Sequence, residues 1–226
     1  MGSVNSGAVP GMVDTQMCRD DTAPSTTINS PTAGTWQYAN FGVSISDSDT
    51  GGSGISTCYL RVNGGQRTRE CDKAVTITVD TRPSSTADCK TDGVNACTVG
   101  AWATDVAGNT GGTATRIFHI DATAPVVTAF SASASQTNAL PKLNYTVTDS
   151  YGYGLFSVEL WRATNIGGPW SNIGISASIS GASASGSLTD TTLAVGPNSP
   201  QDGSYYYGLH VLDGAGNCIT ETGQHC

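Results

Sequence analysis

Hydrophobic and polar residues alternate along this chain in short runs. In Phe41–Ser46, three apolar side chains (Phe41, Val43 and Ile45) alternate with glycine and serine, and Val75–Val79 repeats the pattern. A period of two places the apolar side chains on one face of a β-strand. Gly, Asp and Asn residues separate the runs, as in the turns of β-sandwiches. The pattern therefore predicts an all-β chain.

The same pattern predicts strands along most of the sequence. In the first half they are Ser25–Ile28, Phe41–Ser46, Thr57–Val62, Arg67–Glu70, Val75–Val79, Cys97–Thr104 and Arg116–Ile120. In the second half they are Val126–Ala132, Lys142–Thr148, Phe156–Ala163, Ile173–Ser180 and Tyr205–Leu212. The Ala- and Ser-rich stretch 176–187 offers few core side chains, so we expect a weak strand and a loop there. Its functional alternative is a flat hydroxyl-bearing face that contacts ice or glycan.

An internal repeat divides the chain into two modules. The segment 20–24, with Asp20 and Pro24, returns about 100 residues later as 121–125. The segment 105–109 (DVAGN) returns as 213–217 (DGAGN). We therefore expect one module at 20–121 and a second at 122–226, after an N-terminal extension at 1–19 that is a linker or added sequence. The short connection containing Pro125 predicts a semi-rigid rod.

Charge and hydropathy exclude two classes of partner. Ten Lys and Arg residues stand against eighteen Asp and Glu residues, which gives a net charge of -8. Phosphate binding needs clustered basic residues, so we expect no nucleic-acid partner. A membrane span needs about 20 consecutive apolar residues, and the sequence has no such run. The N-terminus has no signal-peptide pattern, so we expect a fragment of a longer exported protein.

The seven cysteines favour an oxidising compartment. Three local pairs are expected to form disulfides: Cys58 with Cys71, Cys89 with Cys97, and Cys218 with Cys226. Cys18 remains without an assigned partner. The alternative is a set of free buried thiols in a cytosolic protein. The pairing predicts an extracellular location, at the cell surface or secreted.

The repeated landmarks resemble those of the bacterial immunoglobulin-like (Ig-like) repeats of surface proteins and adhesins. Such repeats often open with Asp-x-x-x-Pro, continue with an Asp before a Gly-Ser-Gly turn and end with Asp-x-Ala-Gly-Asn. Both halves of this chain carry the pattern, although the second has Tyr153 inside its glycine turn. The resemblance implies two tandem Ig-like β-sandwich modules and an exported parent protein.

The recurring aspartates allow two interpretations. In the structural one, each Asp-x-Ala-Gly-Asn segment is a tight turn in which the Asp accepts hydrogen bonds from its own backbone. In the functional one, which the resemblance implies, Ca²⁺ binds at the module ends through carboxylate oxygens. The candidate ligands are Asp20 or Asp21 with Asp47 and Asp105 in the first module, and Asp121 with Asp149 and Asp213 in the second.

No catalytic motif is present, and we expect no enzyme. The histidines His119, His210 and His225 are isolated, and the three glutamates (Glu70, Glu159 and Glu221) lie far apart in sequence and in predicted position.

The aromatic residues offer a different kind of site. Trp102 and Trp161 are the core candidates, whereas Trp170, Tyr151 and Tyr153 lie in loops and could form a ligand surface.

The favoured function is a non-catalytic stalk or adhesion segment of a larger bacterial surface or secreted protein. Its partners would be neighbouring domains and a host glycan or surface protein. The alternatives are a carbohydrate-binding accessory module of a secreted hydrolase, and an Ig-like decoration of a phage or virion.

Overall fold

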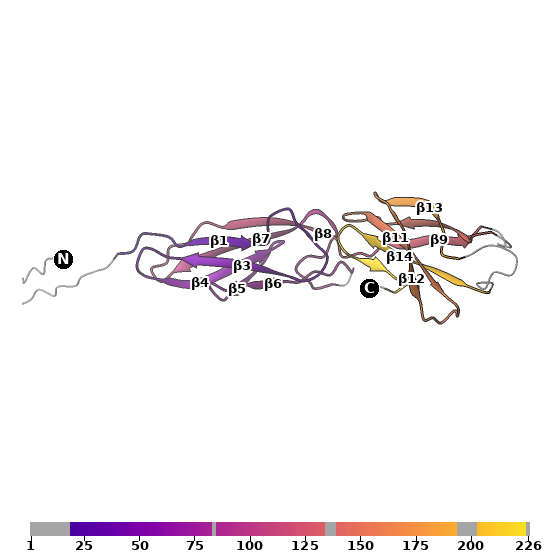
Figure 1. Ribbon diagram of the computed structural model, residues 1–226. Helices are drawn as coiled ribbons and strands as arrows, with labels where there is room; N and C mark the ends of the chain where they lie inside the picture. Colours follow the sequence, from indigo (N-terminus) through magenta and orange to yellow (C-terminus); the bar gives the residue numbers. More distant parts are fainter. Residues whose placement is uncertain (1–18, 83–84, 134–138, 194–202, 225–226) are drawn as a thin grey trace, which may run out of the picture.

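The computed structural model describes residues 19–82, 85–133, 139–193 and 203–224, and within these ranges it contains fifteen strands and no helix. The strands form four sheets, two from β1–β8 and two from β9–β15 (Figure 1). We call the first group module 1 and the second module 2. Among these residues there is no helix with the length and apolarity needed to cross a membrane.

Module 1 packs a three-stranded sheet against a five-stranded one. The first sheet has the order β1-β3-β6 and consists of β1 (Ser25–Ser30), β3 (Phe41–Ser48) and β6 (Val75–Ile77). The second has the order β2-β8-β7-β4-β5 and consists of β2 (Trp36–Gln37), β8 (Ala114–Ile120), β7 (Gly93–Asp105), β4 (Ile55–Val62) and β5 (Gly65–Arg69). Their facing side chains form one core that includes Val43, Leu60, Val99 and Phe118.

Module 2 repeats this arrangement. Its three-stranded sheet has the order β13-β10-β9, with β13 (Ser183–Thr189), β10 (Lys142–Thr148) and β9 (Val126–Ala132). Its four-stranded sheet has the order β12-β11-β14-β15, with β12 (Ser171–Ser178), β11 (Leu155–Ala163), β14 (Tyr206–Asp213) and β15 (Cys218–Ile219). A separate core forms between them around Val147, Val158, Leu160 and Val211.

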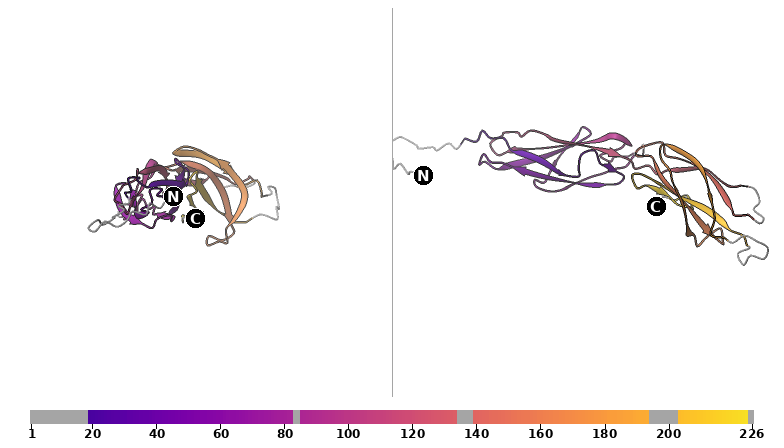
Figure 2. Two further views of the ribbon diagram at one scale, coloured as in Figure 1. Left: turned by 90° about the vertical axis from the view of Figure 1, so that its left-hand side faces the viewer. Right: turned by 45° about the horizontal axis from the view of Figure 1, so that its top comes forward.

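The two modules lie end to end and form an elongated rod (Figures 1 and 2). Each core contains residues of its own module only. The predicted all-β class and the Ig-like β-sandwich architecture are therefore confirmed.

Three features differ from the expected strands. The Ala- and Ser-rich stretch 176–187 contains the end of β12 and most of β13, a strand that pairs with β10 along its whole length and buries Leu188. Trp102 and Trp161 lie half-buried outside both cores, because the small residues Ala101 and Ala103 take the inward positions of β7 and Leu160 takes that of β11. The two-residue strands β2 and β15 escaped prediction because they are too short for a visible alternation.

Two of the expected disulfides are present, joining Cys58 to Cys71 and Cys89 to Cys97. Cys218 is also disulfide-bonded. Its expected partner Cys226, as well as Cys18 and His225, lies outside the described residues.

Candidate cation site at the module junction

Three aspartates meet at the end of module 2 that faces module 1. Asp121 directly follows β8, Asp149 directly follows β10, and Asp213 is the last residue of β14. Each offers one carboxylate oxygen, and these oxygens all lie within 4.8 Å of one another. The three residues are 0%, 2% and 3% exposed, so three acidic groups share a site almost without solvent.

The turn 213–217 fixes the orientation of the Asp213 carboxylate. One oxygen of Asp213, Oδ1, accepts hydrogen bonds from the backbone N–H groups of Ala215, Gly216 and Asn217 at 2.7–2.9 Å. The side-chain amide of Asn217 donates to Oδ2 of Asp213 at 2.7 Å and to the backbone carbonyl of Asp121 at 2.9 Å. The segment is thus the tight turn that the sequence predicts. Through Asn217 it also binds the backbone of the linker at Asp121.

Burial makes the charged forms of these carboxylates unfavourable. The pKa of Asp121 is raised to about 7, chiefly by burial and further by the nearby Asp213, Asp149 and Asp92, against a hydrogen bond from the Tyr153 backbone. The pKa of Asp149 is also raised, chiefly by burial. Its Oδ2 atom is buried and has no hydrogen-bond partner among the described residues.

The donor set fits a hard divalent cation. Buried charges are tolerated when they are paired or coordinate a metal. Ca²⁺ prefers carboxylate and carbonyl oxygens, and it would supply the positive charge that these three groups lack. The unpartnered oxygen of Asp149 is the atom that such an ion would satisfy. Chemistry and burial therefore both suit a calcium site formed by Asp121, Asp149 and Asp213.

Glycine is required beside this site. A Cβ atom on Gly152 would lie 2.0 Å from Cγ of Asp121, and the backbone φ of Gly152 is +76°. The glycine turn before β11 therefore lets the backbone approach the linker carboxylate closely.

Module 1 carries an equivalent cluster at its opposite end. Asp20, Asp49 and Asp105 also place carboxylate oxygens within 4.8 Å of one another. The side-chain amide of Asn109 donates to the carbonyl of Asp20 at 2.9 Å and to Oδ2 of Asp105 at 2.8 Å, as Asn217 does in module 2. Only Asp105 is buried here, and hydrogen bonds from Ser53 and from the Thr22 backbone lower the pKa of Asp20.

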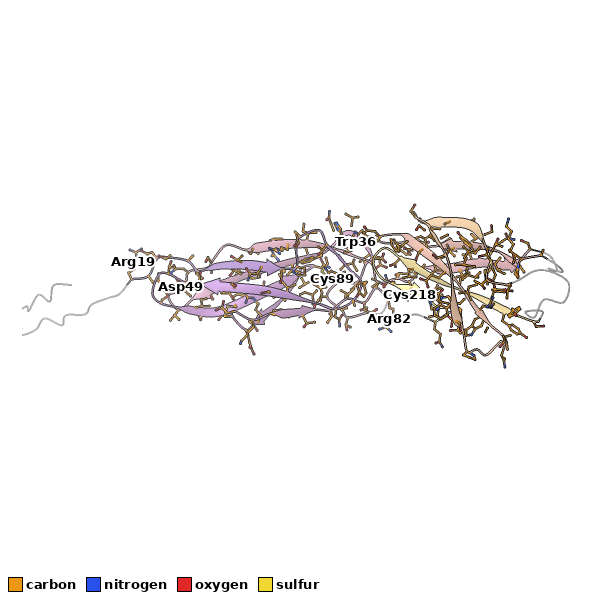
Figure 3. The ribbon with its side chains drawn as sticks, viewed as in Figure 1. Arg19, Trp36, Asp49, Arg82, Cys89 and Cys218 are labelled. Carbon is orange, nitrogen blue, oxygen red and sulfur yellow. A yellow bond between two sulfur atoms is a disulfide. The ribbon has the colours of Figure 1, made fainter. Side chains whose placement is uncertain are left out.

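Two predicted calcium ligands of module 1 do not join this cluster. Asp47 lies on β3 with its side chain fully buried, and it pairs with Arg69 at 2.6 Å. Its place in the cluster is taken by Asp49, which follows the end of β3 (Figure 3). Asp21 is exposed and pairs with Arg19 at 2.6 Å. The repeat alone could not separate Asp47 from Asp49, because both acids precede the glycine turn.

Aromatic residues pack against one another at the module junction, beside the acidic site. The ring of Trp36 lies 4.9 Å from that of His119 and 5.4 Å from that of Tyr153, measured between centroids. Tyr153 covers Gly214, where an added Cβ would lie 1.9 Å from the tyrosine ring. Asp92 of module 1 accepts a hydrogen bond from the Ala122 backbone N–H at 2.8 Å. Module 1 thus holds both the linker and the glycine turn of module 2.

The predicted ligand surface separates into different environments. Tyr153 belongs to the contact between modules, although 56% of its surface is exposed. Tyr151 is 61% exposed, whereas Trp170 is half-buried beside Gly168. The structure therefore does not gather these three aromatic residues into one platform.

Two glutamates that the sequence placed far apart lie beside one histidine. Glu221 hydrogen-bonds to His210, and Glu159 is the cross-strand partner of His210 on β11. Trp161 stacks on the same imidazole with centroids 4.0 Å apart. Only the pairing of β11 with β14 reveals this group, since no motif marks it in the sequence.

Comparisons with known proteins add two similarities of overall structure. One is to the FN1–FN3 domains of chicken CNTN1, with 12% identity and a TM-score of 0.39, over 90% of this chain and 65% of that one. The other is to the fibronectin(III)-like modules of CbhA from Clostridium thermocellum, with 14% identity and a TM-score of 0.35, over 86% of this chain and 88% of that one. No protein-family profile and no curated protein matches the sequence.

Proposed function

We propose that this chain is a non-catalytic, extracellular spacer segment of a larger surface or secreted protein, made rigid by Ca²⁺ at the module junction. The single observation that carries the proposal is the buried cluster of Asp121, Asp149 and Asp213, which has no cationic partner in the described part of the chain. A bound divalent cation would balance this charge.

The position of the cluster explains why an ion would stiffen the rod. Asp121 belongs to the linker, whereas Asp149 directly follows β10 and Asp213 ends β14 of module 2. An ion held by all three would restrain the linker against module 2, while Asp92 restrains the next residues against module 1. The bending freedom of a two-module chain would then decrease, which is the property that a stalk needs.

The disulfides support an extracellular location. Cys58–Cys71 and Cys89–Cys97 both lie in module 1, and Cys218 of module 2 is also disulfide-bonded. Such bonds persist in oxidising compartments and are rare in the cytosol. Extracellular calcium-binding modules commonly have dissociation constants of about 10⁻⁴–10⁻³ M, so the site would be filled in calcium-rich fluids outside the cell.

Calcium titration of the whole chain tests the proposal. We expect isothermal titration calorimetry to detect binding to the EDTA-treated protein, and small-angle X-ray scattering to show a narrower distribution of shapes with Ca²⁺. Asp149→Asn should weaken this binding about ten-fold or more, because it removes one ligand charge with little change of volume.

The matched control is Asp21→Asn, which removes an exposed carboxylate outside both clusters. It should bind Ca²⁺ like the unaltered chain. No calcium-dependent heat, together with an unchanged melting midpoint in EDTA, would overturn the proposal.

A further inference from the structure

The outer face of the five-stranded sheet of module 1 carries a stacked aromatic pair. Tyr59 on β4 and Trp102 on β7 are cross-strand partners, and their rings are parallel within 16° with centroids 5.3 Å apart. Both point away from the core, since Leu60 and Ala101 occupy the inward positions beside them. The guanidinium carbon of Arg61 lies 5.7 Å from the centroid of the Trp102 ring.

Arg61 differs from the other arginines in having no acidic or carbonyl partner within the described residues. Five arginines form ion pairs with aspartates: Arg19, Arg67, Arg69, Arg82 and Arg162. Arg116 donates to the backbone carbonyls of Asn29 and Pro31. Arg61 is exposed, and among the described residues it forms a cation–π contact but no hydrogen bond or ion pair, so its N–H donors remain open to a ligand.

The strand face around Arg61 carries no acidic side chain. The outward positions of β4, β5, β7 and β8 hold no Asp or Glu, although the chain as a whole has a net charge of -8. The outward positions around the aromatic pair also hold hydroxyl and amide residues: Thr57, Gln66, Thr68, Thr98 and Thr104. This face is therefore an acid-free surface on an acidic protein.

We infer that this face binds an acidic polysaccharide, one whose sugar rings carry carboxylate groups. A guanidinium pairs with a carboxylate through two parallel hydrogen bonds. Aromatic rings offer flat apolar faces with a negative quadrupole, against which the C–H groups of a sugar ring can pack. The threonines and Gln66 supply donors and acceptors for sugar hydroxyls. Each chemical component of such a ligand thus has a matching group on the face.

The same residues favour a sugar over a protein partner. The core of a protein interface is largely apolar. On these four strands only two large hydrophobic side chains are exposed. They are Val94, at the start of β7, and Ile117, of which 39% is exposed. A polymer that presents alternating hydroxyl and carboxylate groups fits this polar, threonine-lined surface better.

Binding of polygalacturonate to the full chain tests the inference. The measurement is made in EDTA, so that neither the junction site nor calcium bridging of the polymer contributes. We expect quenching of tryptophan fluorescence and binding that weakens as salt is added. Arg61→Gln and Trp102→Ala should each lower the affinity about ten-fold. Arg19→Gln, at an exposed arginine far from this face, should leave it unchanged.

Two results would overturn the inference. One is the absence of binding to polygalacturonate and to alginate, a second carboxylated polymer. The other is equal binding of the methyl-esterified polymer, because the ester retains the sugar rings and loses the charge. Thermal melts of the Arg61→Gln chain verify folding, and its response to Ca²⁺ should match that of the unaltered chain. The test therefore stands apart from the calcium proposal.

Discussion

The buried carboxylates of the junction should make the calcium-free protein less stable as pH rises. In the folded chain the pKa of Asp121 is about 7, whereas in the unfolded chain it returns to about 3.8. Between these values the folded state keeps a proton that the unfolded state has released, so the free energy of unfolding falls with increasing pH. The whole difference corresponds to about 4 kcal/mol, of which about 3 kcal/mol falls between pH 5 and pH 8.

Scanning calorimetry of the EDTA-treated chain at pH 5 and pH 8 measures this loss. Asp47, Asp88 and Asp190 have lowered pKa values, and their stabilisation is already nearly complete at pH 5. They therefore change little over this interval. Ca²⁺ at 100 times its dissociation constant should restore about 3 kcal/mol at pH 8. It should do less at pH 5, where protons compete for the same carboxylates.

Asp121→Asn is the control for any pH dependence of stability that arises elsewhere in the chain. This variant should lose most of the excess pH dependence and most of the response to Ca²⁺. If the unaltered chain and the variant had the same difference in stability between pH 5 and pH 8, the electrostatic reasoning would be refuted.

Three further substitutions probe the supporting structure. Gly152→Ala should destabilise module 2 by about 1–3 kcal/mol in chemical denaturation and weaken calcium binding, because the new Cβ atom would clash with the carboxylate of Asp121. The control Gly112→Ala, where a Cβ atom would meet no other atom, should have little effect. Asp47→Asn should cost about 3–5 kcal/mol in denaturation of module 1, because it leaves Arg69 buried without its counter-charge. Trp36→Ala should leave both melting transitions nearly unchanged yet broaden the shape distribution seen by X-ray scattering, because it removes a contact between the modules.

The architecture was predictable because alternation and repetition can both be recognised in the sequence without knowing which side chains meet in space. Strands such as β3 and β10 bury every second residue, as their sequences require. The strand β13 was predicted only in part, because its outward serines and inward alanine differ little in hydropathy. Only Leu188 gives it a strong core contact, and pairing with β10 determines its length.

The candidate sites were less predictable, because they depend on which side chains face one another. A repeat shows that an acid recurs before each glycine turn, but it does not choose between Asp47 and Asp49. That choice follows from strand length: Asp47 remains within β3 and meets Arg69, and Asp49 has left the strand. The pairing of Tyr59 with Trp102 likewise depends on the register of β4 against β7.

The differences between the two modules explain how one end of a sandwich becomes a junction. Both ends use the same hydrogen bonds, since Ser53 and Tyr153 each donate a backbone N–H to the first aspartate of their cluster. In module 2 the tyrosine ring extends to Trp36, and a glycine takes the place that Val106 holds in module 1. The glycine leaves room for the ring, which lies over the residue that directly follows Asp213. A structural turn shared by both modules therefore becomes part of a fully buried acidic cluster at the end where a neighbouring module packs against it.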